Sequence, residues 1–152
     1  MAGVILSGLL VAAVGLFANL GRSRQTLLDA DVAADLAVSL MEEIKQQAYA
    51  DPTQSGFGPE PGEAGLTRAL FDDVDDYHNW TETPPQDRLG NALPRGAGLT
   101  RSVQVRYVAA NDFTKTAAAD EGFKEVQIAV RRGGPTLARQ TYVVADVPPA
   151  QR

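Results

Sequence analysis

Residues 2–20 form an uninterrupted apolar run, AGVILSGLLVAAVGLFANL, without a charged side chain. As a helix rising about 1.5 Å per residue, this run reaches roughly 28 Å, close to the hydrocarbon thickness of a bilayer. It lacks the basic region and the small-residue cleavage site of a signal peptide. We therefore expect a retained membrane helix over residues 1–24. Its apolar side chains are expected to pack in the bilayer: Val4, Ile5, Leu6, Leu9, Leu10, Val11, Val14, Leu16 and Phe17.

Residues 25–50 (QTLLDADVAADLAVSLMEEIKQQAYA) continue the helical pattern, but this second half is amphipathic. Ala, Leu, Glu and Gln, which favour helices, dominate its composition. Asp51-Pro52 ends the pattern, because proline disfavours the helical conformation of the preceding residue. One face carries apolar residues at fourfold spacing, and this face is expected to pack on a sheet through Leu28, Val32, Leu36, Leu40 and Ile44.

Residues 51–98 are rich in Gly and Pro and are predicted to be irregular. Residues 99–147 contain three patterns of alternating polarity, over 99–108, 123–131 and 137–144, that indicate strands. The sequence RGGP at 132–135 is expected to connect the last two strands as a hairpin. The predicted fold class is therefore α+β, with a long N-terminal helix packed on a small antiparallel sheet of about three to four strands.

Charge is distributed unevenly along the chain. Residues 25–76 hold 12 acidic and 2 basic residues, whereas residues 77–152 hold 7 acidic and 10 basic residues. This division suggests either that copies or relatives meet head to stalk, or simply that the acidic face is solvated. The net charge of −5 and the scattered arginines argue against nucleic-acid binding.

The residue types that nucleophilic catalysis requires are scarce. The chain has no cysteine, and its single histidine, His78, has no sequence partner at triad or metal-ligand spacing. We therefore expect no enzymatic activity, and we expect His78 to be exposed or hydrogen-bonded in a loop.

Asp72, Asp73, Asp75 and Asp76 form the densest local group of charges. Four carboxylates within five positions repel one another unless water or a cation compensates them. Calcium, which takes several oxygen ligands, is one interpretation, although the spacing is not that of an EF-hand loop. A solvated acidic turn, paired with arginines of the sheet, is the other. No other cofactor is indicated.

Three aromatic residues, Phe71, Tyr77 and Trp80, flank this group of aspartates. They could form a platform for a sugar or a partner. Aromatic residues at such positions more often fill a small core beneath a long loop.

Several segments resemble the type IV pilin-like proteins, the pilins and pseudopilins of type IV pili and type II secretion systems. The run AGVILSGLLVAAVGLFANLGRSRQ is similar to their hydrophobic assembly helix, and ADVAADLAVSLMEEIKQQAYADP is similar to the stalk of minor pseudopilins of the I and V types. The blocks FDDVDDYHNWTETPP and GLTRSVQVRYV resemble a head variant of prepilin-type proteins. The family's processing motif, with Glu at the fifth mature position, is not found here, so no processing residue is assigned.

This resemblance implies a single-pass subunit of the bacterial inner membrane with its head in the periplasm. Its partners would be other pilin-like subunits and an assembly platform protein, and an assembly ATPase would move it into a periplasmic or extracellular filament. The apolar residues of 1–24 would then also pack in the filament core. An alternative is a membrane-tethered extracytoplasmic binding domain that never polymerises, with the aromatic and acidic loop as its ligand site.

Overall fold

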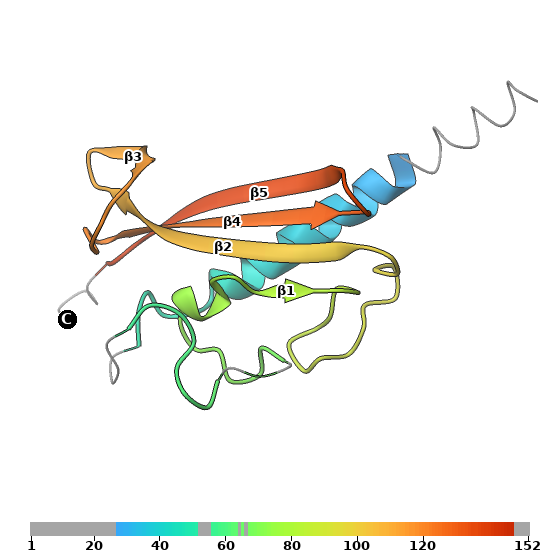
Figure 1. The fold of residues 1–152 in the computed structure, drawn as a ribbon, viewed down its shortest axis with the longest axis horizontal. Coiled ribbons are helices and arrows are strands. Elements are labelled where there is room, and N and C mark those ends of the chain that lie inside the picture. The colour runs from blue at the N-terminus through green and yellow to red at the C-terminus, as the bar shows by residue number, and fades with distance from the viewer. Residues whose placement is uncertain (1–26, 52–55, 64, 66, 148–152) are drawn as a thin grey trace, which may run out of the picture.

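The computed structural model describes residues 27–51, 56–63, 65 and 67–147. The apolar run and its nine predicted packing residues lie outside this part of the chain. Within it, residues 27–44 form one α-helix, and no helix there is long and apolar enough to cross a membrane. The helix lies against one face of an antiparallel sheet, as Figure 1 shows. The chain is therefore an α+β protein, as the sequence predicts.

The sheet contains five strands. In spatial order β1, β2, β4 and β5 are neighbours, and β3 pairs with β2 outside this path. Every pairing is antiparallel. The strands are β1 (Thr81–Glu82), β2 (Thr100–Ala109), β3 (Asp112–Thr116), β4 (Phe123–Arg131) and β5 (Thr136–Ala145), and a 3₁₀ turn, η1 (Asp75–Tyr77), precedes β1.

The prediction of three to four strands is wrong, because two short strands carry no alternating apolar residues. Strand β1 (TE) lies in the region predicted to be irregular, and it pairs with β2 through Thr81↔Ser102 and Glu82↔Arg101. Strand β3 (DFTKT) lies between the predicted strands 99–108 and 123–131 and folds back on the end of β2. Charge pairing and a tight turn, rather than a hydrophobic pattern, therefore bring these two segments into the sheet.

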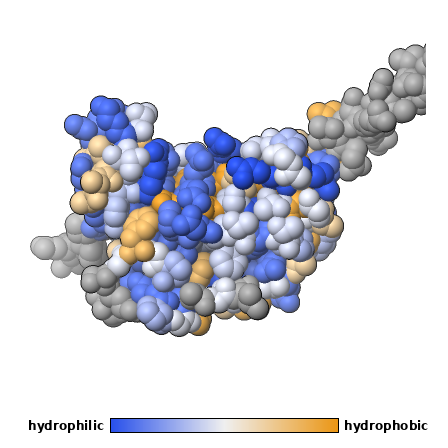
Figure 2. Space-filling view, viewed as in Figure 1, coloured by the Kyte–Doolittle hydropathy of each residue, from blue (hydrophilic) through white to orange (hydrophobic). Residues whose placement is uncertain are grey.

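The sheet has one apolar face and one polar face. On the inner face, Val103 lies opposite Ile128 and Val105 opposite Val126, and all four side chains are buried. The intervening residues of β2 and β4 face outward and include a polar group, Gln104, Arg106, Glu125 and Gln127. In Figure 2 the molecule is largely blue and white on the side facing the viewer, with small orange patches.

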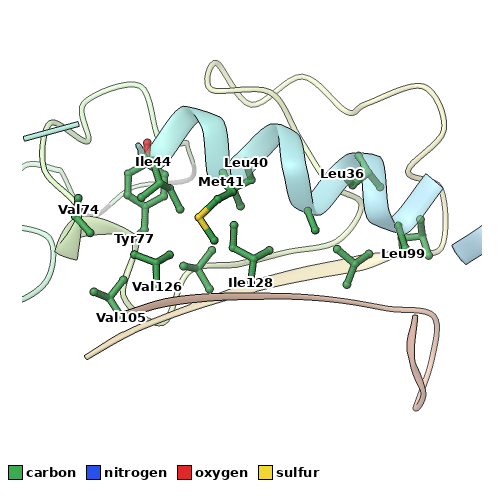
Figure 3. Packing of buried hydrophobic residues seen from close by; sticks show 14 of the residues in the cluster. Leu36, Leu40, Met41, Ile44, Val74, Tyr77, Leu99, Val105, Val126 and Ile128 are labelled. Carbon is green, nitrogen blue, oxygen red and sulfur yellow. The ribbon is translucent and has the colours of Figure 1, made fainter. Parts of the chain in front are cut away.

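The helix covers the inner face with the apolar stripe that the sequence predicts. Val32, Leu36, Leu40 and Ile44 are buried in the core, and Figure 3 shows the last three above the sheet strands. Ala33, Ala37 and Met41 are buried beside them.

Leu28 does not belong to this core, because its side chain is 47% exposed. It lies near the end of the sheet, where the β4–β5 turn contributes a charged contact between Arg132 and Asp29 at 2.8 Å. The first turn of the helix therefore meets an ion pair and not an apolar surface. The expectation that Leu28 packs on the sheet is wrong for this reason.

Substitution of Leu40 by Ala is expected to lower the free energy of unfolding by about 2–5 kcal/mol, because it leaves a cavity in the helix–sheet core. Leu28→Ala is the matched control and should change it by less than about 0.5 kcal/mol. Urea unfolding of the full chain in mild detergent, followed by the fluorescence of its single tryptophan, measures both effects. Equal losses in the two variants would contradict the observed packing.

Candidate functional site

The four predicted aspartates lie in one turn, residues 72–77, which we call the aspartate turn. Asp73 holds this turn together through its carboxylate. Its Oδ1 accepts hydrogen bonds from the backbone N–H groups of Asp75 (2.7 Å) and Asp76 (3.2 Å), and its Oδ2 accepts one from Asp51 (2.7 Å). Burial and the charges of Asp75 and Asp76 raise the pKa of Asp73 to about 6.

Asp75 is neutralised by the sheet. Its Oδ1 forms a buried ion pair with Lys124 of β4, and its Oδ2 accepts a hydrogen bond from the backbone N–H of Gly58 at 2.9 Å. Lys124 also donates to the carbonyl oxygen of Tyr49. This single carboxylate therefore joins the aspartate turn, the sheet and the loop that contains Gly58.

Lys124 pairs with Asp75, whereas Asp76 lies close to two glutamates. Its Oδ2 accepts hydrogen bonds from the backbone N–H groups of Asp72 (2.9 Å) and Asp73 (3.1 Å). One carboxylate oxygen each from Glu60, Glu63 and Asp76 lies within 4.8 Å of the other two. We call these three residues the carboxylate trio.

The four aspartates therefore do not form one calcium site, contrary to that interpretation of the sequence. The carboxylate of Asp73 accepts hydrogen bonds from backbone N–H groups, and the carboxylate of Asp75 forms an ion pair with Lys124. The side chain of Asp72 is exposed. Of these four aspartates, Asp76 is the one that belongs to the carboxylate trio. The two glutamates that meet it are not part of the aspartate-rich segment, and only the fold of residues 56–63 reveals them.

Burial disfavours charge in the carboxylate trio. It raises the pKa of Asp76, and the charge of Glu60 adds to the rise, although backbone N–H groups of Asp73 and Asp72 oppose it. Burial and hydrogen bonding with Glu60 raise the pKa of Glu63 to about 7. These shifts indicate that three negative charges are poorly compensated where the trio converges.

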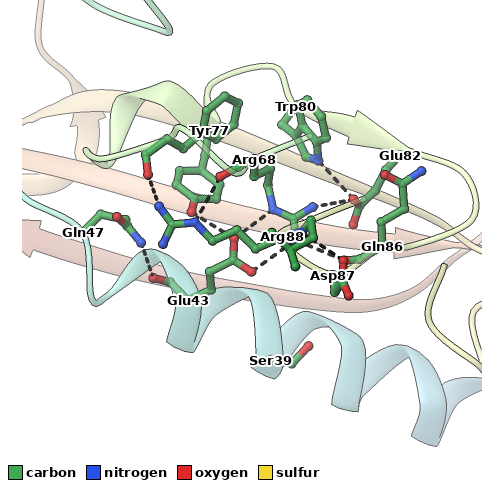
Figure 4. A network of polar contacts seen from close by, with 12 residues as sticks. Ser39, Glu43, Gln47, Arg68, Tyr77, Trp80, Glu82, Gln86, Asp87 and Arg88 are labelled. Atoms are coloured by element: carbon green, nitrogen blue, oxygen red, sulfur yellow. Dashed lines mark hydrogen bonds and ion pairs between the residues drawn. The ribbon is translucent and has the colours of Figure 1, made fainter. Parts of the chain in front are cut away.

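A second polar cluster lies between the helix and β1, and we call its four residues, Glu43, Arg68, Glu82 and Arg101, the charge network. Figure 4 shows Glu43, Arg68 and Glu82 of this network. Arg68 contacts Glu43 at 2.9 Å and Glu82 at 2.6 Å. Arg101 contacts the other oxygen of Glu82 at 2.5 Å. Two cations and two carboxylates balance each other, so this network needs no further ion.

Residues of the charge network also form hydrogen bonds with backbone carbonyl groups and with aromatic side chains. Arg101 donates to the carbonyl oxygens of Leu36 (2.8 Å) and Gln86 (2.8 Å), which ties the helix to the irregular region. Burial lowers the pKa of Arg101, although the charge of Glu82 opposes that shift. Sequence reasoning missed this network, because its members are spread from position 43 to position 101.

The aromatic residues flanking the aspartates lie mainly in the core. Phe71 contacts Tyr77 and Trp80 edge-on, with ring centroids 5.0 and 5.5 Å apart. The Tyr77 hydroxyl donates to Glu43 at 3.0 Å, and the Trp80 indole donates to Glu82 at 3.2 Å. These contacts match a small core beneath a long loop, the second of the two interpretations drawn from the sequence.

His78 is hydrogen-bonded, since its Nδ1 accepts from the backbone N–H of Val105 at 3.3 Å. Its ring also contacts Phe57 edge-on, with centroids 5.0 Å apart. Both partners position the imidazole against β2 and the loop 56–63.

Comparisons with known proteins identify no relative. No protein-family model matches the chain, and no curated protein or solved structure matches it significantly. Function is therefore inferred from the chain's own residues.

Replacement of Glu82 by Gln is expected to lower the free energy of unfolding by about 3–5 kcal/mol, because it leaves two buried arginines with one carboxylate. Glu42→Gln removes an exposed partner of Lys45 and should cost at most about 0.5 kcal/mol. Urea unfolding followed by tryptophan fluorescence compares the two variants. A tolerated Glu82→Gln would mean that the charge network is not essential to the packing of the irregular region.

Proposed function

We propose that this chain is a non-catalytic, pilin-like subunit that is anchored in the inner membrane and assembles into a type IV pilus-like or type II secretion filament. The observation that carries the proposal is the relation between two neighbouring segments. In sequence, the apolar run of residues 2–20 directly precedes the helix whose opposite end packs on the sheet. An apolar segment and a folded head joined in this order are what a filament subunit needs.

The helix–sheet core supports the proposal mechanically. Leu36, Leu40 and Ile44 bury the helix in the head, and Arg101 adds a hydrogen bond to the helix backbone. A force on the helix is therefore transmitted to the whole head. Transfer of an apolar helix from lipid to a bundle of similar helices has little hydrophobic cost, so packing and polar contacts would decide it.

The polar groups of the head also fit a structural role. Arg68, Arg101 and Lys124 are all buried, and each is engaged by carboxylates and backbone carbonyls. The geometry thus uses these charges to hold segments together. This use favours a subunit that acts by association over one that acts by catalysis.

A membrane-tethered binding domain is the second candidate, and one observation favours it. A groove of about 270 Å³ runs between the helix and the segment 93–95, with Val32, Leu36 and Leu93 among its apolar lining residues. Such a groove could take a small apolar ligand or the side chains of a partner.

Photo-crosslinking in the native bacterium distinguishes the two candidates. A photoreactive side chain at position 27, where Leu27 is 68% exposed, should capture a pilin-like subunit only while the assembly ATPase is active. The photoreactive side chain placed instead at Phe113, on β3, tests whether crosslinking to a pilin-like subunit depends on the position of the probe along the molecule. Membrane-bound protein that gives no ATPase-dependent adduct from position 27 would contradict filament assembly and favour the tethered binding domain.

A further inference from the structure

The carboxylate trio lies where two separate segments meet. Glu60 and Glu63 belong to the loop 56–63, and Asp76 belongs to the aspartate turn. The loop is positioned over the turn by the hydrogen bond from Gly58 to Asp75 and by the contacts of Phe57 with His78 and Tyr107. Contacts outside the trio therefore help to bring its three carboxylates together.

Two oxygens of the trio are buried without a partner. Asp76 is only 1% exposed, and its Oδ1 has no hydrogen-bond partner among the described residues. Oε2 of Glu60 is also buried, and it too has no such partner within the described part of the chain. A buried carboxylate oxygen without a donor or a cation is costly, so this arrangement calls for a positive charge.

The protein does not supply that charge from the described residues. There, no Lys, Arg or His forms an ion pair with Glu60, Glu63 or Asp76. Asp75 differs from Asp76 in this respect. It is adjacent to Asp76 in sequence and equally buried, but Lys124 neutralises it. The sheet thus compensates one of the two neighbouring aspartates and leaves the other unpaired.

We propose that Glu60, Glu63 and Asp76 bind a calcium ion that clamps the loop 56–63 onto the aspartate turn. Ca²⁺ binds oxygen ligands at about 2.3–2.6 Å, so two ligands on opposite sides of the ion lie roughly 4.6–5.2 Å apart. The three carboxylate oxygens, all within 4.8 Å of one another, fit around one such ion. Water and backbone carbonyls would complete its coordination.

The ligand set favours calcium over other cations. Zinc and copper prefer sites with imidazole or thiolate ligands, and the trio offers carboxylates alone. Magnesium usually keeps several waters and binds one or two carboxylates in strict octahedral geometry. Three carboxylates from two irregular segments suit the flexible coordination of calcium better.

The site lies beside a pocket, and the only tryptophan of the chain lines that pocket. Asp76 lines a pocket of about 220 Å³ together with Pro59, His78 and Trp80, which gives an ion a route to its buried carboxylate. Trp80 is the only tryptophan of the chain, so its fluorescence reports on this pocket. Calcium binding should therefore change both the melting temperature and the Trp80 emission.

The test uses the full chain in mild detergent at neutral pH, with bound metal removed by a chelator. When free calcium exceeds the dissociation constant about a hundredfold, the melting temperature should rise by about 5–10 °C. Titration of Trp80 fluorescence and calorimetry with calcium chloride measure the affinity. Glu60→Gln and Glu63→Gln should each weaken binding by at least about tenfold.

Asp72→Asn is the matched control, because Asp72 lies in the same aspartate turn but is exposed and outside the trio. It should retain the affinity of the unchanged protein. Both glutamates lie in a loop, so their variants should stay folded in chelator, and the melting curve checks this directly.

Three results would overturn the proposal. If calcium and chelator leave the melting temperature and Trp80 emission unchanged, the trio shares a proton and binds no ion. If Asp72→Asn abolishes binding while the two glutamate variants retain it, the ion is bound elsewhere in the aspartate turn. An equal response to magnesium would refute the assignment to calcium.

Discussion

A sheet with one apolar face must be covered, and this requirement organises the whole head. The helix covers the valines and isoleucine at the centre of β2 and β4. The two ends of the same inner face are charged, because Arg101 lies opposite Val130 at one end and Lys124 lies opposite Tyr107 at the other. Charged ends cannot be covered by a purely apolar segment, so the acidic region between the helix and β2 covers them instead.

This arrangement explains the uneven charge of the sequence. Ion pairs within the head join the acidic first part of the chain to the basic second part, at Asp29–Arg132 and at Asp75–Lys124. Part of the charge division is thus compensated within one molecule. Buried ion pairs add little net stability, but loss of one partner is costly. Their main contribution is therefore to fix where the irregular segments lie.

The sequence predicted the elements that depend on local periodicity and missed those that depend on distant charges. Val32, Leu36, Leu40 and Ile44 follow a helical repeat, and the three long strands alternate in polarity, so both were predictable. No local pattern links Glu82 to Arg101 or Glu60 to Asp76. The four-aspartate interpretation of the calcium site failed for the same reason, since only the fold decides which carboxylate meets Lys124.

The proposed filament helix and the proposed calcium site lie in different parts of one molecule, and the strength of calcium binding connects them. A site of three carboxylates that draws the rest of its ligands from water is expected to bind calcium weakly. Weak calcium sites, with dissociation constants of about 10⁻⁴–10⁻³ M, are typical of extracellular modules, where calcium is abundant. If the head lies in the periplasm, as the resemblance to pilin-like proteins implies, the loop 56–63 would be clamped only after the head has left the cytoplasm.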